Sequence, residues 1–165
     1  MMPPSTEHER PRGAESMSET TFRLRLVTPA ESLLDEPVEY VNLPMWDGLM
    51  GFMRNRAPLV GRLGLGEMTV RFSSATGGAE RRYLIDGGFA QMADNELIVL
   101  AEFAIPAEAI AESDAQAEVN EADAMKPDTS AEDPGAEADR IRGVRDRARL
   151  KLRLAREHRG AGRGI

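Results

Sequence analysis

The region from Thr21 to Ala104 is divided by turn-forming residues into short segments, and none of these segments has a convincing helical period. Phe22, Leu24 and Leu26 alternate with arginines, which is the period-two pattern of a strand with one buried face. Many short strands with turn signals every ~8–12 residues are typical of an all-β sandwich or barrel. We therefore predict an N-terminal β-sandwich domain over residues 21–104.

The same alternation places the individual strands. They are expected at residues 22–26, 38–43, 49–53, 67–72, 81–86 and 96–101. Asp47-Gly48, Thr76-Gly77-Gly78 and Asp94-Asn95 supply residue types that favour tight turns. Gly87-Gly88 is expected to break a strand, with Phe89 in the core. A phosphate-binding loop at these glycines is not expected, because no helix follows them.

Residues 105–165 differ in composition and predict a charged two-helix tail. The first helix, from Ala107 to Ala124, consists largely of good helix formers and carries only acidic charges. The second, from Asp139 to about His158, is strongly basic and has a narrow apolar stripe. A proline-containing linker near 125–138 separates the two helices.

The opposite charges of the two helices favour an antiparallel α-helical hairpin. Each exposed ion pair contributes only about 0–1 kcal/mol and is screened by salt. The narrow apolar stripe adds little to this. We therefore expect a hairpin that docks weakly and opens.

Composition excludes several classes of function. The chain has 165 residues and no cysteine, so disulfides, thiolate metal sites and cysteine nucleophiles are excluded. A net charge of -7 disfavours general nucleic-acid binding, and no apolar run approaches the ~20 residues of a membrane span. Residues 1–20 are polar and are expected to form a disordered extension. Neither His8 nor His158 has a catalytic or metal-binding setting, and we expect no catalytic, metal or cofactor site.

A series of short motifs runs through the sandwich region in a fixed order. They are FRLRLVTP at 22–29, LP at 43–44 with DGLMGF at 47–52, RAPLV at 56–60, Leu63 with GE at 66–67, DGGF at 86–89, and DN at 94–95 before LIVLA at 97–101. Each motif is weak alone, but their joint order and spacing are specific. In these motifs the chain resembles the epsilon subunits of F-type ATP synthases, which are called delta in mitochondria. The resemblance implies a sandwich of about ten strands followed by a helical hairpin.

The resemblance also implies a function. Epsilon subunits have no active site and belong to the central stalk, the rotor of a proton-translocating ATP synthase. They bind the gamma subunit and rest on the membrane c-ring, and they help couple rotation of the ring to the catalytic head. The hairpin of many bacterial members extends and inhibits ATP hydrolysis. The expected location is peripheral, on the cytoplasmic side of the bacterial cytoplasmic membrane.

Two groups of residues are candidates for contact with the c-ring. Trp46, Asp47, Gly48 and Leu49 align with the family loop that touches the ring, and an exposed Trp is a good interface anchor. The alternative is that Trp46 caps the sandwich core. The second group is Arg54, Arg56 and Arg62, which either pair with carboxylates of the ring or are solvated.

We also expect an exposed apolar patch on one sheet face, because torque transmission needs extended contact. Its candidates are Met45, Leu49, Met50, Phe52 and Met53, of which some must be core.

The basic helix carries a second candidate site. Five arginines recur at spacings of three and four: Arg142, Arg145, Arg149, Arg153 and Arg156. In the family, such residues meet an acidic loop of the catalytic beta subunit when the hairpin extends. The alternative is that this cationic strip pairs with the acidic first helix, and both can hold in different states.

Two departures from the family pattern limit these inferences. Asn55-Arg56 stands where members often have Gly-His, which is not a catalytic position. The stretch 109–116 contains Asp114 but no arginine, so we expect no tight ATP binding by the hairpin. Two other classes stay open: a ligand-binding β-sandwich with a solubilising tail, and a nucleic-acid module that uses the basic helix.

Overall fold

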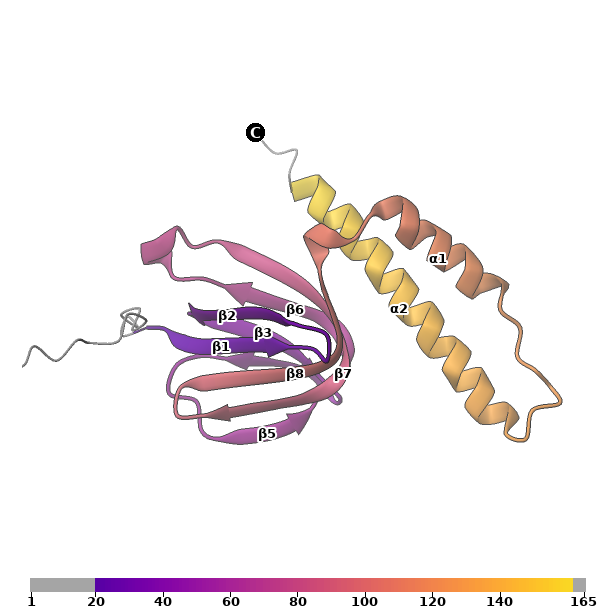
Figure 1. Cartoon of the computed structure of the whole chain (residues 1–165), viewed down its shortest axis with the longest axis horizontal. Coiled ribbons are helices and arrows are strands. Elements are labelled where there is room, and N and C mark those ends of the chain that lie inside the picture. Colours follow the sequence, from indigo (N-terminus) through magenta and orange to yellow (C-terminus); the bar gives the residue numbers. More distant parts are fainter. Residues whose placement is uncertain (1–19, 162–165) are drawn as a thin grey trace, which may run out of the picture.

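The computed structural model describes residues 20–161. The expected disorder of the N-terminal extension therefore falls outside the described residues, apart from Thr20. The described chain forms a β-sandwich followed by a helical hairpin that lies to one side of it (Figure 1). This confirms the predicted fold class, although the sandwich has eight strands rather than about ten.

The elements follow one another without long insertions. The strands are β1 (Phe22–Val27), β2 (Ser32–Val38), β3 (Tyr40–Met45), β4 (Gly48–Phe52), β5 (Leu59–Arg62), β6 (Leu65–Arg71), β7 (Glu80–Ala93) and β8 (Glu96–Pro106). The helices are the 3-10 turns η1 (Ser74–Thr76) and η2 (Ala107–Ala109), then α1 (Glu112–Ala124) and α2 (Pro134–Ala161).

The strand order is β2-β1-β8-β7-β6-β3-β4, and β5 pairs with β7 beside β6. All pairs are antiparallel except β1 with β8. β6 pairs with the first half of β7, from Leu65↔Asp86 to Arg71↔Glu80, and β5 pairs with the second half, from Leu59↔Met92 to Arg62↔Phe89. The long β7–β8 hairpin thus contributes to both layers.

The strand break expected at Gly87-Gly88 is wrong. β7 continues through both glycines, which adopt φ values of 75° and 117°. Tyr83 and Ile85 face the core before the glycines, whereas Ala90 and Met92 face it after them. The glycines therefore let the strand turn from one layer to the other and exchange its inward side.

Two prolines explain other differences from the expected strands. β2 was not predicted, and it contains Pro37; as a strand at the end of the sheet order it tolerates the missing N–H. The strand expected at 38–43 instead runs from Tyr40 to Met45 as β3 and includes Pro44. Gly66 leaves room for its ring, since a Cβ at Gly66 would lie 2.6 Å from the Pro44 Cβ.

The main core fills the space between the two layers. The alternation predicted for the first strand is confirmed, because Phe22, Leu24 and Leu26 are fully buried. Phe52 and Met68 are buried in the same cluster. A ligand-binding sandwich would need a large internal pocket at this place, and large apolar side chains occupy it instead.

The tail helices begin elsewhere than expected. Residues 107–109 form only η2, and α1 starts at Glu112. α2 starts at Pro134, five residues earlier than predicted, because proline suits a first helical turn and the Asp133 side chain accepts a hydrogen bond from the Ala136 N–H. Neither helix of the described chain is long and apolar enough to cross a membrane.

A second, smaller core joins the tail to the sandwich. Leu84 of β7, Ala107 of η2 and Leu154 of α2 are buried together. Leu65, Phe103, Ile105, Ile110 and Leu150 pack around them. α2 therefore lies on the outer side of β6 and β7, while α1 packs mainly on α2.

Candidate interaction surfaces

The turn between β3 and β4 presents a large aromatic side chain at the surface. Trp46 is 64% exposed and Leu49 is 66% exposed, so Trp46 does not cap the core. The Trp46 N–H donates to the Arg62 carbonyl (2.9 Å), and the Arg62 guanidinium lies 5.7 Å from the Trp46 ring centroid. Gly48 permits the turn with a φ of 135°. The structure thus joins four of the predicted ring-contact residues, Trp46, Gly48, Leu49 and Arg62, in one corner.

Arg54 and Arg56 belong to a neighbouring loop. The Arg54 guanidinium donates to the Thr21 carbonyl (3.2 Å), and Arg56 lies over the Phe52 ring at 5.3 Å. The loop is tied to the β7–β8 turn, where the Asn55 N–H donates to Asn95 Oδ1 (2.7 Å). It borders a surface hollow of about 490 Å³. Both arginines therefore already have contacts within the chain.

The candidates for the expected apolar patch divide between core and surface. Of its five candidates, Met45 and Phe52 are core residues and Met50 is half-buried, which leaves Leu49 and Met53 exposed.

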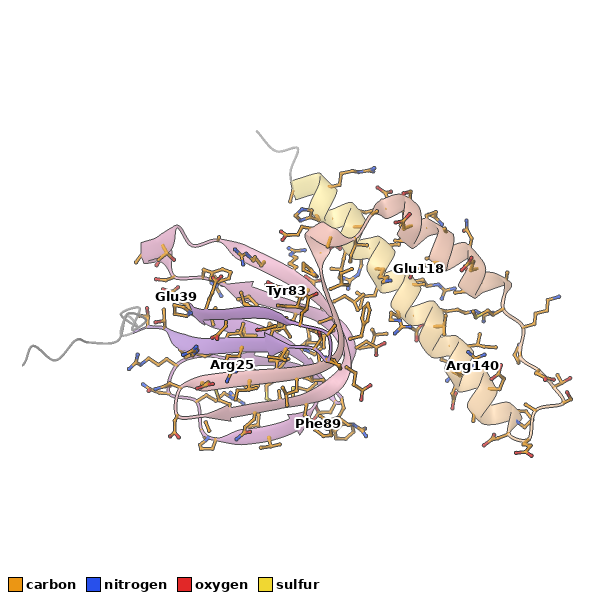
Figure 2. The ribbon with its side chains drawn as sticks, viewed as in Figure 1. Arg25, Glu39, Tyr83, Phe89, Glu118 and Arg140 are labelled. Carbon is orange, nitrogen blue, oxygen red and sulfur yellow. The ribbon has the colours of Figure 1, made fainter. Side chains whose placement is uncertain are left out.

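The larger exposed apolar side chains of the sheet form what we call the apolar strip: Val60 (69% exposed), Phe89 (57%) and Leu100 (53%). Phe89 pairs with Leu100 of β8, and Val60 pairs with Gln91, which is two residues after Phe89 on β7. Val60, Phe89 and Leu100 therefore lie on one sheet face. Figure 2 shows Phe89 on the outside of the sandwich.

No pattern in the sequence predicted the apolar strip. The prediction that Phe89 is a core residue is wrong, because the inward side of β7 changes at Gly87-Gly88. If β7 kept the same alternation throughout, Phe89 would face the core like Tyr83 and Ile85. Only a reading of Gly-Gly as a turn within a strand would have placed it outside.

The two tail helices are joined by ion pairs. Four cations of α2 meet three carboxylates of α1: Arg149–Asp123 (2.9 Å), Lys151–Glu118 (2.8 Å), Arg156–Glu112 (3.2 Å) and Arg159–Glu112 (2.6 Å). The Arg145 guanidinium donates to the carbonyls of Ala122 (3.0 Å) and Met125 (2.7 Å) at the C-terminal end of α1. These contacts are the antiparallel charge pairing that the sequence predicted.

The five arginines of the predicted cationic strip do not share one partner. Arg145, Arg149 and Arg156 contact α1. Arg153 reaches the sandwich instead, and Arg142 pairs with Asp139 one turn earlier on its own helix (2.9 Å). The strip is wide enough for its two edges to point toward different neighbours.

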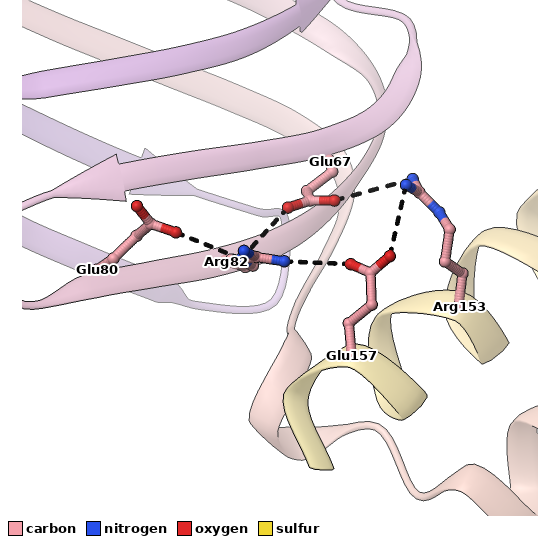
Figure 3. A network of polar contacts seen from close by, with 5 residues as sticks. All are labelled: Glu67, Glu80, Arg82, Arg153 and Glu157. Atoms are coloured by element: carbon pink, nitrogen blue, oxygen red, sulfur yellow. Dashed lines mark hydrogen bonds and ion pairs between the residues drawn. The ribbon is translucent and has the colours of Figure 1, made fainter. Parts of the chain in front are cut away.

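A polar network connects α2 to the sandwich (Figure 3). Glu67 is its centre, since its carboxylate lies 3.5 Å from Arg82 of β7 and 3.8 Å from Arg153 of α2. Arg82 also meets Glu80 (3.4 Å) and Glu157 (3.1 Å), and Arg153 meets Glu157 (3.9 Å). If α2 separates from the sandwich, both arginines keep a partner. Arg82 keeps Glu67 and Glu80, and Arg153 keeps Glu157.

Sequence reasoning did not single out Arg147, which makes a further contact with the sandwich. Its guanidinium lies 3.0 Å from the Asp86 carboxylate and 5.4 Å from the Phe103 ring centroid. Near the start of α2, a hydrogen bond from Arg140 holds the pKa of the Glu137 carboxyl below its ordinary value. Both interactions favour the docked, helical form of α2.

The stretch that corresponds to the nucleotide site of some family members is small and acidic. It borders a hollow of about 110 Å³ that includes Asp114, Glu118 and Lys151. Both carboxylate oxygens of Glu118 accept hydrogen bonds from Lys151 (2.8 and 2.9 Å). The absence of tight ATP binding by the hairpin stays a prediction, and this acidic arrangement agrees with it.

Comparison with known proteins gives consistent matches. Residues 21–107 match the family "ATP synthase, Delta/Epsilon chain, beta-sandwich domain". The ATP synthase epsilon chain of Rhodopirellula baltica is 38% identical over 136 residues, which cover 82% of this chain and 99% of that one. The sodium ion specific epsilon chain of Propionigenium modestum is 39% identical over 85 residues, which cover 52% of this chain and 59% of that one.

Solved structures share the fold. A chain of the Euglena gracilis mitochondrial ATP synthase (OSCP/F1/c-ring) aligns with a TM-score of 0.60 at 23% identity, covering 98% of this chain and 90% of that one. A chain of the central stalk and c-ring of the Tetrahymena thermophila mitochondrial ATP synthase aligns with a TM-score of 0.56 at 16% identity, covering 81% and 95%.

Proposed function

Because this chain belongs to the ATP synthase delta/epsilon family, we propose that it is a non-catalytic subunit of the rotor stalk of a proton-translocating F-type ATP synthase. It couples rotation of the c-ring to the catalytic head. Its work is mechanical, so it needs a rigid body with exposed contact surfaces rather than an active-site cleft. The complex lies at the cytoplasmic side of the bacterial cytoplasmic membrane, and the chain joins it peripherally.

The observation that carries this proposal is the sandwich itself with its two exposed apolar surfaces. The core is closely packed and large, and Trp46 and the apolar strip stand out from it toward solvent. Exposed aromatic and apolar side chains beside arginines are the residues that dominate protein interfaces. We assign the Trp46 corner, with Asp47, Gly48, Leu49 and Arg62, to the c-ring. We assign the apolar strip to the gamma subunit.

Co-purification with gamma from detergent-solubilised membranes tests the assignment. Phe89→Ser with Leu100→Ser removes the centre of the apolar strip, and we expect this variant to lose gamma. Gln91→Ser is the matched control, because Gln91 lies on the same sheet face and is exposed. Retention of gamma by the double variant at the level of the control would refute the assignment of the strip.

The tail supports a regulatory role that accompanies the mechanical one. In the closed hairpin, Arg145, Arg149 and Arg156 contact the acidic α1. In an extended hairpin they exchange α1 for an acidic segment of the beta subunit, together with Arg142 and Arg153. Each closed pair is exposed and individually weak, so the exchange is nearly balanced.

Removal of residues 125–165 tests this role. The shortened chain should still join the complex through its sandwich, and ATP hydrolysis by the isolated catalytic head should rise. Unchanged hydrolysis at normal subunit content would show that the tail does not inhibit.

A further inference from the structure

The tail is held in place at two interfaces, which differ in their large apolar contacts. The first interface, between α2 and the sandwich, combines an apolar cluster with the ion pairs Arg82–Glu157, Arg147–Asp86 and Arg153–Glu67. Leu154 is almost completely buried with Leu84, and Leu150, Phe103 and Ile105 pack around them. Burial of apolar surface does not depend on screening by ions, so the apolar part of this interface persists when salt screens its ion pairs.

The second interface, between α1 and α2, has no large buried apolar residue from α1. The buried residues of α1 are two alanines, Ala115 and Ala122, and the buried residues of α2 outside the sandwich-side cluster are Ile141, Ala148, Leu152 and Ala155. The ion pairs of Asp123, Glu118 and Glu112 supply most of its specific contacts with α2. Their side chains range from 16% exposed for Lys151 to 65% for Arg159, and the exposed pairs weaken as the Debye length falls from ~10 Å at 0.1 M to ~3 Å at 1 M salt.

α1 is also a poor helix when it stands alone. It has 13 residues, and isolated helices of about this length are marginal in water. Its N-cap, Ala111, makes no side-chain cap hydrogen bond. Asp114 and Glu118 are like charges four residues apart, which destabilise a helix in isolation. α1 therefore depends on the cations of α2 to remain folded.

α2 does not depend on α1 in the same way. It has 28 residues and keeps its own ion pairs Arg140–Glu137 and Arg142–Asp139. Its apolar anchor Leu154 contacts the sandwich side, not α1. Residues 110–133 are long enough to connect η2 to α2 as a loop, so α1 can unfold without any movement of α2.

From these contrasts we propose that α1 is a salt-sensitive strap, which detaches from α2 and unfolds while α2 stays seated on the sandwich. The basic side of α2 that carries Arg149, Lys151 and Arg156 is exposed by this step alone. The first opening of the tail is therefore local and precedes any extension of the hairpin. The inference concerns the isolated chain and does not depend on the proposed function.

Hydrogen–deuterium exchange of the full chain tests the proposal. Amides of 112–124 should exchange roughly tenfold faster at ~1 M than at ~0.05 M sodium chloride, since several exposed pairs are lost together. Amides of 147–157 and of β6–β7 should change by less than about twofold. Loss of protection in α1 and α2 together, or no salt response in α1, would overturn the proposal.

Two variants separate the strap from the anchor. Glu118→Gln with Asp123→Asn removes two of the pairs, so it should accelerate exchange in α1 at low salt and reduce the salt response there. Leu154→Ala weakens the seat of α2 and should leave the salt response of α1 in place. If the charge variant keeps the full salt response, or if Leu154→Ala abolishes it, the strap does not exist. Protection of the β-sheet amides verifies that each variant is folded.

Discussion

Gly88 occupies a position where backbone conformation and close packing both require glycine. Its φ is 117°, and a Cβ there would lie 2.0 Å from the Leu100 carbonyl oxygen. This oxygen belongs to the backbone of the neighbouring strand β8, which cannot move aside as a flexible side chain would. The exposure of Phe89 one residue later depends on this turn, so a single glycine links the fold to the proposed gamma surface.

Gly88→Ala should therefore destabilise the sandwich by about 3 kcal/mol or more. Gly77→Ala is the matched control, because Gly77 also has a positive φ (105°) but has nothing within 4 Å of an added Cβ. The control should cost only about 1–2 kcal/mol. Urea unfolding of both variants checks the difference, and equal losses would show that the close approach to Leu100 is unimportant.

α2 illustrates how one element serves two neighbours. Leu150, Leu154 and Arg153 face the sandwich, while Arg149 and Arg156 face α1. Glu67 is the sandwich residue that this arrangement needs most, since it is only 18% exposed and contacts two arginines from different elements.

Glu67→Gln should weaken the seating of α2 by about 1 kcal/mol, because Arg82 and Arg153 lose the carboxylate between them. Faster exchange of the amides of 150–158 would report this effect. Glu80→Gln is the control, since Glu80 contacts only Arg82 of the network and lies at its edge. Equal exchange in both variants would contradict a central role for Glu67.

At the scale of the whole molecule, stability and function are carried by different surfaces. The main core lies between the two layers, whereas the Trp46 corner and the apolar strip are exposed and contribute little to folding. Changes at these surfaces should therefore alter assembly or coupling while the chain stays folded.

Trp46→Ala should change the free energy of unfolding of the isolated chain by no more than about 0.5 kcal/mol, as is usual for exposed positions. In membrane vesicles it should lower ATP-driven proton pumping relative to ATP hydrolysis. Met53→Ala, at another exposed apolar residue, should leave this ratio unchanged. Normal pumping by the Trp46 variant in a fully assembled complex would refute the c-ring assignment.

Local properties of the sequence determined the fold class and the charge pairing of the tail. The alternation of Phe22, Leu24 and Leu26 and the turn residues at Asp94-Asn95 act over a few residues, so they are visible without the fold. The same holds for the acidic and basic blocks that become α1 and α2, and for the motifs that carry the family resemblance.

Only the tertiary structure decided which side chains face outward and which cations meet which carboxylates. Phe89 is exposed because β7 pairs with β6 before Gly87-Gly88 and with β5 after it, a long-range pairing that a short window cannot contain. The arginines of α2 divide between α1 and Glu67 because the apolar contact of Leu154 fixes the rotation of the helix. Both outcomes depend on residues that are distant in sequence and adjacent in space.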